Sequence, residues 1–125
     1  MLVKNGEVVE ALRAVRILSE QKMPFGAAMA VRKLLRELSA VVDDVEAERL
    51  KLVRRYAVVG EDGQPVVEGN RYLFGEKQSE FNAGYGDLLA AEVEVSAPPL
   101  HSKGMEHVEV EPWLLVSLGP FLVEE

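Results

Sequence analysis

Two histidines, His101 and His107, are the residues of this 125-residue chain best suited to acid–base or metal chemistry. They lie six residues apart with Glu106 between them, which is not a standard ligand interval on a helix or a strand, and no His-Glu-x-x-His pattern occurs. Ser102 follows His101, but a serine nucleophile needs a base, an orienting carboxylate and an oxyanion hole brought together in space. We therefore predict two solvent-exposed histidines, no metal site and no catalytic residue.

Residues 84–87, Gly-Tyr-Gly-Asp, share their glycine content with phosphate-binding loops. They lack a preceding strand, a third glycine and a Lys-Ser or Lys-Thr pair, which a phosphate loop requires. Close packing of a helix at Gly84 and Gly86, against Tyr85, is the favoured interpretation. The sequence predicts no cofactor.

Charged residues are concentrated on one long predicted helix. Its densest acidic run could suggest a divalent-cation site or paired catalytic carboxylates, and comprises Asp43, Asp44, Glu46 and Glu48. On a helix these carboxylates spread around the solvent face, and Glu46 with Arg49 or Glu48 with Lys51 can form i,i+3 ion pairs. We predict a solvated charged face. The same helix carries a basic stripe that could contact an acidic partner or nucleic acid, at Arg32, Lys33, Arg36, Arg49, Lys51, Arg54 and Arg55.

The overall composition narrows the class of protein. With 21 acidic and 14 basic residues the net charge is −7, so the average surface repels phosphate backbones and anionic membranes, and we do not expect nucleic acid or a membrane as partner. There is no cysteine, which excludes disulfides, iron–sulfur clusters and thiolate zinc sites. No apolar stretch approaches the length of a membrane span and no secretory pattern opens the chain, so we expect a cytoplasmic protein. The scarcity of Asn and Gln would also suit a thermophile.

The first part of the chain, about residues 5–56, predicts a helical hairpin. Asn5 is a suitable N-cap for a helix whose apolar residues recur every three or four positions up to about residue 18. Residues 22–26 interrupt this pattern, and Pro24 suits the first turn of a second helix that runs to about Arg55, over about 45 Å. The first helix is about half as long, so part of the second helix's apolar stripe must be covered otherwise. A third helix containing Phe81 and Tyr85 is expected to cover it, with a protein partner or a second copy of the chain as the alternative.

The remainder, about residues 57–125, predicts a small β and helical portion. Residues 56–59 and 65–67 flank an Asp62-Gly63 turn signal and predict a hairpin. Residues 92–95 and 107–110 alternate charged and apolar side chains, as paired strands do. Residues 112–118 predict a short helix with Pro112 in its first turn and Gly119-Pro120 after its end. The residues expected to complete the core are Trp113, Leu115, Leu118 and Phe121.

These elements define a predicted α+β fold within a single domain, 1–125: a long antiparallel α-helical hairpin with a third helix and a small antiparallel β portion. The order of features resembles a family of small uncharacterised proteins encoded by tailed bacteriophages. The matching stretches are residues 3–5, 48–56, Glu61-Asp62-Gly63, Phe81 with residues 88–93, and residues 113–121. The resemblance implies a phage origin, hence a location in the host cytoplasm or the virion, and supplies no catalytic residue.

Two functional classes follow, neither of them enzymatic. The first is a virion structural or assembly accessory that docks on virion components or on copies of itself. The alternative is a host-takeover factor that binds and inhibits a host enzyme such as RNA polymerase or a defence nuclease. Aromatic residues and Met are enriched at the centres of interfaces, and the long helix stripe adds two apolar positions. The candidate interface residues are Met23, Phe25, Val45, Leu52, Tyr72, Phe74 and Trp113.

Overall fold

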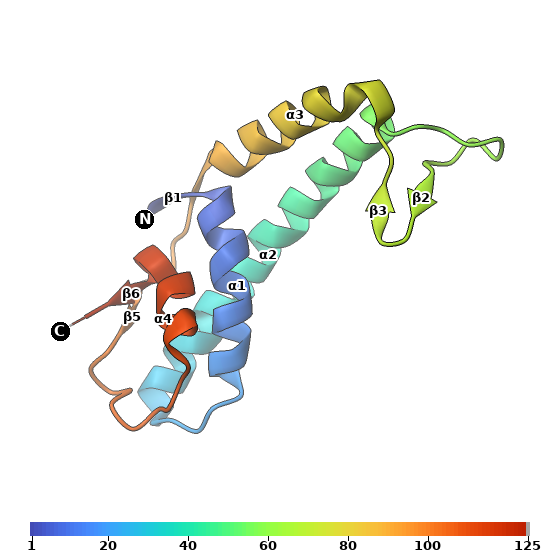
Figure 1. The fold of residues 1–125 in the computed structure, drawn as a ribbon. Helices are drawn as coiled ribbons and strands as arrows, with labels where there is room; N and C mark the ends of the chain where they lie inside the picture. The colour runs from blue at the N-terminus through green and yellow to red at the C-terminus, as the bar shows by residue number, and fades with distance from the viewer. Residues whose placement is uncertain (125) are drawn as a thin grey trace.

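The computed structural model describes residues 1–124 and shows an elongated molecule built along one long helix (Figure 1). The helices are α1 (Asn5–Ser19), α2 (Phe25–Tyr56), α3 (Gln78–Ala90) and α4 (Pro112–Leu118), with 3₁₀ turns at Gly75–Lys77 and Gly119–Phe121. The strands are β1 (Leu2–Lys4), β2 (Val67–Glu68), β3 (Arg71–Tyr72), β4 (Glu92–Glu94), β5 (Leu100–His101) and β6 (Leu122–Val123). The predicted α+β class, with its helical hairpin and third helix, is confirmed.

The helical hairpin forms because α1 and the first half of α2 each present an apolar stripe. α1 has 15 residues and α2 has 32, so α1 covers only the first half of α2. α4 packs on α1, and strand β5 contacts α2. The side chains buried between these elements are called the proximal core, and include Leu12, Val15, Leu34, Leu38, Leu100, Leu114, Leu118 and Phe121.

The second half of α2 is contacted by α3, which begins beside the end of α2 and runs back at an angle toward the start of α1 (Figure 1). Val53 of α2 and Ala57, the residue after its end, are buried against Phe74 and Phe81, and these four residues are called the distal core. The rings of Phe74 and Phe81 stack with their centroids 4.0 Å apart. The apolar stripe of α2 is therefore completed within the chain, as predicted, and the alternative of a partner covering this part of the helix is not needed.

Strand pairing departs from the sequence prediction. β4 pairs antiparallel with β1, with Val3 opposite Val93, and not with residues 107–110, which form no strand. β5 and β6 pair in parallel, with Leu100 opposite Leu122. Alternation of charged and apolar residues marks a side-chain pattern but does not identify the pairing partner, because pairing between distant segments is set by how the helices bring them together.

The predicted hairpin around Asp62-Gly63 is also shifted along the chain. Tyr56 remains helical, and the Asp-Gly turn closes only a single bridge between Val59 and Pro65. The hairpin with paired strands is β2–β3, which reverses at Gly69, where φ is +64°. Glycine adopts this left-handed conformation with little strain because it has no Cβ. The Gly69-Asn70 pair is a turn signal that the sequence prediction did not use.

The start of α1 is anchored differently from the prediction. The N-cap is Lys4, whose backbone N–H donates to the Glu7 carboxylate at 3.0 Å, and Asn5 is the first helical residue. The Asn5 side-chain amide donates instead to the carbonyl of Leu88 (2.9 Å), and the Asn5 backbone N–H donates to the carbonyl of Ala91 (2.9 Å). Asn5 thus ties the beginning of α1 to the end of α3.

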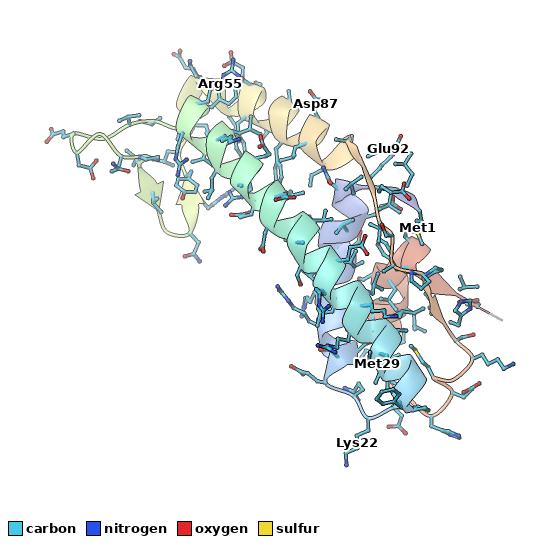
Figure 2. The ribbon with its side chains drawn as sticks, turned by 180° about the vertical axis from the view of Figure 1, so that it is seen from behind. Met1, Lys22, Met29, Arg55, Asp87 and Glu92 are labelled. Carbon is cyan, nitrogen blue, oxygen red and sulfur yellow. The ribbon has the colours of Figure 1, made fainter. Side chains whose placement is uncertain are left out.

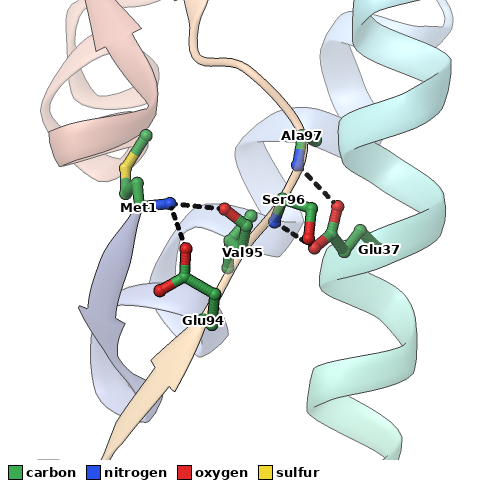
Figure 3. A network of polar contacts seen from close by, with 6 residues as sticks. All are labelled: Met1, Glu37, Glu94, Val95, Ser96 and Ala97. Atoms are coloured by element: carbon green, nitrogen blue, oxygen red, sulfur yellow. Dashed lines mark hydrogen bonds and ion pairs between the residues drawn. The ribbon is translucent and has the colours of Figure 1, made fainter.

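A second tie connects the segment after β4 to α2. The Glu37 carboxylate accepts hydrogen bonds from the backbone N–H groups of Ser96 and Ala97, the latter at 2.8 Å (Figure 3). On the other side of this segment, the Met1 amine donates to Glu94 (2.8 Å) and to the carbonyl of Val95 (2.7 Å). These bonds replace strand pairing as the means of holding an otherwise irregular segment.

The C-terminal helix follows the prediction closely in its bounds. Pro112 is its first residue and Gly119-Pro120 follow its end. Leu118 and Phe121 are buried as predicted, but the prediction for Leu115 was wrong: Leu115 is 45% exposed and its neighbour Leu114 is buried. Trp113 is half-buried, with the Arg13 guanidinium 4.9 Å from its ring centroid. Among the residues described, no helix has the length and apolar character needed to cross a bilayer.

Candidate protein-interaction surfaces

The residues with the greatest potential for chemistry are not gathered into a site. His101 lies in β5 and His107 in the irregular segment that follows it, and both are exposed. Within residues 1–124 no group of three or more His, Asp or Glu side chains is arranged to hold a metal ion, and no charged side chain is buried. Perturbed ionisation in a dry pocket, the usual physical mark of an acid–base site, is therefore not seen in this part of the chain.

The charged face of α2 is an ion-paired solvent surface, as predicted. Arg49 donates to both carboxylate oxygens of Glu46, at 2.9 and 2.6 Å, and Lys51 donates to Glu48 at 2.8 Å. The hydrogen bond from Arg49 lowers the pKa of Glu46, and the same bond raises the pKa of Arg49. Both pairs are i,i+3 contacts on the surface, so each contributes only a few tenths of a kcal/mol.

Gly84 and Gly86, the glycines of the apparent phosphate loop, lie inside α3 and have different surroundings. A Cβ placed on Gly84 would lie 3.1 Å from a methyl carbon of Leu52. A Cβ placed on Gly86 would meet nothing within 4 Å. Close helix packing therefore accounts for Gly84 but not for Gly86.

The predicted interface residues fall into three environments. Val45 and Phe74 are buried, so neither is available on the surface of the monomer. Leu52 and Tyr72 are half-buried around the distal core, and Met23 and Trp113 are half-buried around the proximal core. Phe25 alone of the seven is strongly exposed, at 82%, where α2 begins. In Figure 2 this end of α2, marked by Lys22 and Met29, lies opposite the end marked by Arg55.

A first exposed apolar surface lies at the Arg55 end of α2. Residues 58–73, called here the distal β unit, include the β2–β3 hairpin that projects from the molecule in Figure 1. Backbone bonds join its three segments: Val58 donates to Leu73 (2.7 Å) and Val66 donates to Val58 (2.8 Å). Its exposed apolar side chains are Val58, Val59, Val67 and Leu73, of which Val59 and Val67 are more than half exposed.

A cleft of about 730 Å³ separates the distal β unit from α2 and α3. Its wall includes Arg49 and Arg71 together with Glu68. Because Arg49 is already held by Glu46, the remaining charges in the wall, Arg71 and Glu68, are of opposite sign. The cleft consequently has no strong preference for an anion or a cation.

A second exposed apolar surface is a groove of about 720 Å³ on the C-terminal side of the molecule, called here the C-terminal groove. It lies between the irregular segment after β5, helix α4 and strand β6. Its apolar lining consists of Leu18, Met105, Val108, Val110, Leu115, Leu118 and Leu122. Its polar lining consists of Ser102, Lys103, Glu106 and Glu124. A mostly apolar wall with a few polar groups at its edge is typical of a binding site for another molecule.

The C-terminal groove lies in the most acidic part of the chain. Residues 92–125 contain a single basic residue, Lys103, and seven acidic ones: Glu92, Glu94, Glu106, Glu109, Glu111, Glu124 and Glu125. On the groove wall, the backbone N–H of Gly104 donates to the Glu106 carboxylate at 2.9 Å. Hydrogen bonds from the backbone N–H groups of Glu106 itself and of Gly104 lower the pKa of Glu106. The Glu106 carboxylate is thus fixed at the groove wall by a backbone hydrogen bond.

Comparison with protein-family models, with curated proteins and with solved structures gave no match. The geometry of the chain is therefore the basis for any functional proposal. The sequence prediction contained neither surface. It missed the distal β unit because its hairpin was predicted too early in the chain, and it missed the groove because residues 107–110 were expected to form a strand. The acidity of residues 92–125 was the available signal for the second.

Proposed function

We propose that this chain is a non-enzymatic interaction protein, acting as a virion structural or assembly accessory of the kind encoded by tailed bacteriophages. The observation that supports this role is the exposure of Val58, Val59, Val67 and Leu73 at the far end of a 32-residue helix. Large apolar side chains gathered on one small unit favour association with another protein surface. The proposed contact is with the same unit of a second copy.

The size of the distal core supports a second copy as the partner. It buries four residues among those described, against fifteen in the proximal core. A short two-stranded hairpin is only marginally stable in water unless further strands or a helix pack on it. Pairing of two distal β units would cover the exposed valines on both and add strands to each hairpin, so association and local stability would rise together.

The experiment is a measurement of solution mass by light scattering from about micromolar to hundreds of micromolar, a range that brackets weak to moderate affinity. We expect a defined oligomer whose fraction rises with concentration. The double substitution Val59→Lys and Val67→Lys should return the protein to monomer, because charge on an exposed strand opposes pairing. Val116→Lys is the matched control, since Val116 is 76% exposed but lies on α4, outside the distal β unit.

A host-takeover factor is the second candidate, and the acidic C-terminal groove favours it. Such a factor would bind and inhibit a host enzyme such as RNA polymerase or a defence nuclease, both of which handle nucleic acid and so present basic surfaces. A strict monomer at every concentration would overturn the assembly proposal and leave this candidate. Inhibition of purified host polymerase or nuclease by the monomer would then be the deciding assay.

A further inference from the structure

The C-terminal groove combines an apolar wall with an acidic edge, and this pairing specifies the chemistry of an occupant. Leu115 is 45% exposed although it lies on the same helical turn as the buried Leu114 and Leu118. Met105, Val108 and Val110, from the segment after β5, also line the groove and are only half-buried. An apolar ligand surface laid in the groove would remove these side chains from water, which favours binding.

The segment that carries Met105, Val108 and Val110 is held by turns and not by a sheet. Two local backbone hydrogen bonds shape it: the Met105 N–H donates to the carbonyl of Ser102, and the Val108 N–H donates to that of Met105, each at 3.0 Å. Met is unbranched and its side chain adapts to different apolar surfaces. The wall can therefore fit side chains of several shapes, as grooves that receive amphipathic helices do.

Charge selects among apolar occupants. Glu106 and Glu124 line the groove against one cation, Lys103, and Glu109 and Glu111 lie in the segment that leads from it into α4. A fatty acid or an anionic lipid would bring a further negative charge to this edge and would be repelled. Lysine or arginine placed beside apolar side chains would be attracted, mainly through faster association and selection of partners.

We propose that the C-terminal groove binds an amphipathic segment of a partner protein, with leucine-like side chains against Leu115 and Met105 and with lysine or arginine beside Glu106 and Glu124. The inference rests on the proposed function only in treating the chain as a binding protein. The groove and the distal β unit lie on different parts of the molecule, so each can fail independently of the other.

The test uses the full chain and three synthetic peptides labelled for fluorescence anisotropy. The first has leucine and lysine in amphipathic helical order, the second has the same pattern with glutamate for lysine, and the third is a scramble of the first. At physiological ionic strength, where long-range attraction is screened, we expect the first peptide to bind at least about tenfold more tightly than either of the others. Equal binding of the scramble would show charge attraction alone, and equal binding of the glutamate peptide would show no charge selection; either result overturns the proposal.

Two neighbouring substitutions locate the binding on the protein. Leu115→Glu should weaken binding of the leucine–lysine peptide about tenfold, whereas Val116→Glu should leave it within about twofold of the unmodified protein. Both add the same charge to α4, but Leu115 lines the groove and Val116 does not. Because both side chains are substantially exposed, circular dichroism should show both variants folded. Equal effects of the two variants, or no binding of any peptide, overturn the proposal.

Light scattering of these variants distinguishes peptide binding in the groove from self-association through the distal β unit. Without peptide, Leu115→Glu should not change the oligomeric state measured by light scattering. If Leu115→Glu alone abolishes association, the groove receives a second copy of this chain and the proposed occupant is wrong. If association is lost in the Val59→Lys and Val67→Lys variant while peptide binding is kept, both proposals stand.

Discussion

The two ends of α2 differ in how many apolar side chains are buried around them. Around its first half, the proximal core collects apolar side chains from α1, α2 and α4, from β1 and β5 and from the C-terminal turn, and Phe121 and Leu34 are fully buried. Around its last turns, the distal core relies on Phe74 and Phe81 stacked between α2 and α3. The large proximal core keeps the first half of α2 stably folded. The small distal core lies beside exposed valines, so its region gains the most stability when a partner covers it.

The largest expected effect is on stability, and it should differ between two phenylalanine truncations, one in the proximal core and one in the distal core. Phe121→Ala should lower the free energy of global unfolding by about 3–5 kcal/mol, because it empties the centre of the proximal core. Phe81→Ala should act mainly on the distal core, opening residues 58–90 locally. Urea denaturation measures the first effect, and hydrogen exchange followed by mass spectrometry locates the second. Uniform loss of protection over the whole chain in Phe81→Ala would show that the two cores unfold as one.

A smaller effect is expected where Glu37 holds the segment after β4. Glu37→Ala should lower the free energy of unfolding by about 1–3 kcal/mol, because the N–H groups of Ser96 and Ala97 lose a charged acceptor. Glu37→Gln retains one oxygen acceptor and should recover part of this loss. Thermal denaturation of the two variants gives the comparison. Equal stability of Glu37→Ala and the unmodified protein would show that water replaces the carboxylate at no cost.

Substitution of the two glycines of α3 should stabilise the distal half of the molecule. Gly86→Ala should raise the stability of this helix by about 0.5–1 kcal/mol, since alanine restricts the unfolded chain and its Cβ would meet no neighbour. Gly84→Ala should gain less, because Leu52 must move by a few tenths of an ångström to admit the Cβ. Local hydrogen exchange in α3 measures both changes. A larger gain from Gly84→Ala than from Gly86→Ala would contradict the packing described here.

The smallest effect expected is a pH dependence arising from the Glu46–Arg49 pair. Arg49 lowers the folded-state pKa of Glu46, so the pair's contribution is present above the unfolded pKa of glutamate and is lost as the pH falls through the folded pKa. Because the Glu46 side chain is 52% exposed, the contribution is about 0.3 kcal/mol. Urea denaturation of Glu46→Gln across the acidic range should show a correspondingly shallower loss. Arg49→Gln should show the same shallower loss of stability. The double variant, Glu46→Gln with Arg49→Gln, should show no change beyond that of either single variant.

The sequence by itself determined the helices, because their formation depends on residues close along the chain. Apolar spacing in residues 5–56 and from Phe81 to Leu89, Pro112 at the start of α4 and Gly119-Pro120 after it are local signals, and a helix lies at each of these places. The mismatch in length between the first two helices also predicted that something else covers the rest of the apolar stripe, with a third helix favoured over a partner or a second copy. Glu46 with Arg49 and Glu48 with Lys51 follow from helical spacing in the same way.

Only the tertiary structure decided how distant segments meet. β4 pairs with β1 because Asn5 fixes the start of α1 beside the end of α3, a contact across more than eighty residues that no local pattern encodes. The exposure of Leu115 and the burial of Leu114 depend on how α4 packs on α1. Both candidate surfaces arise in this way: each is the apolar area left over after packing, and that remainder is a property of the whole arrangement, not of any single segment.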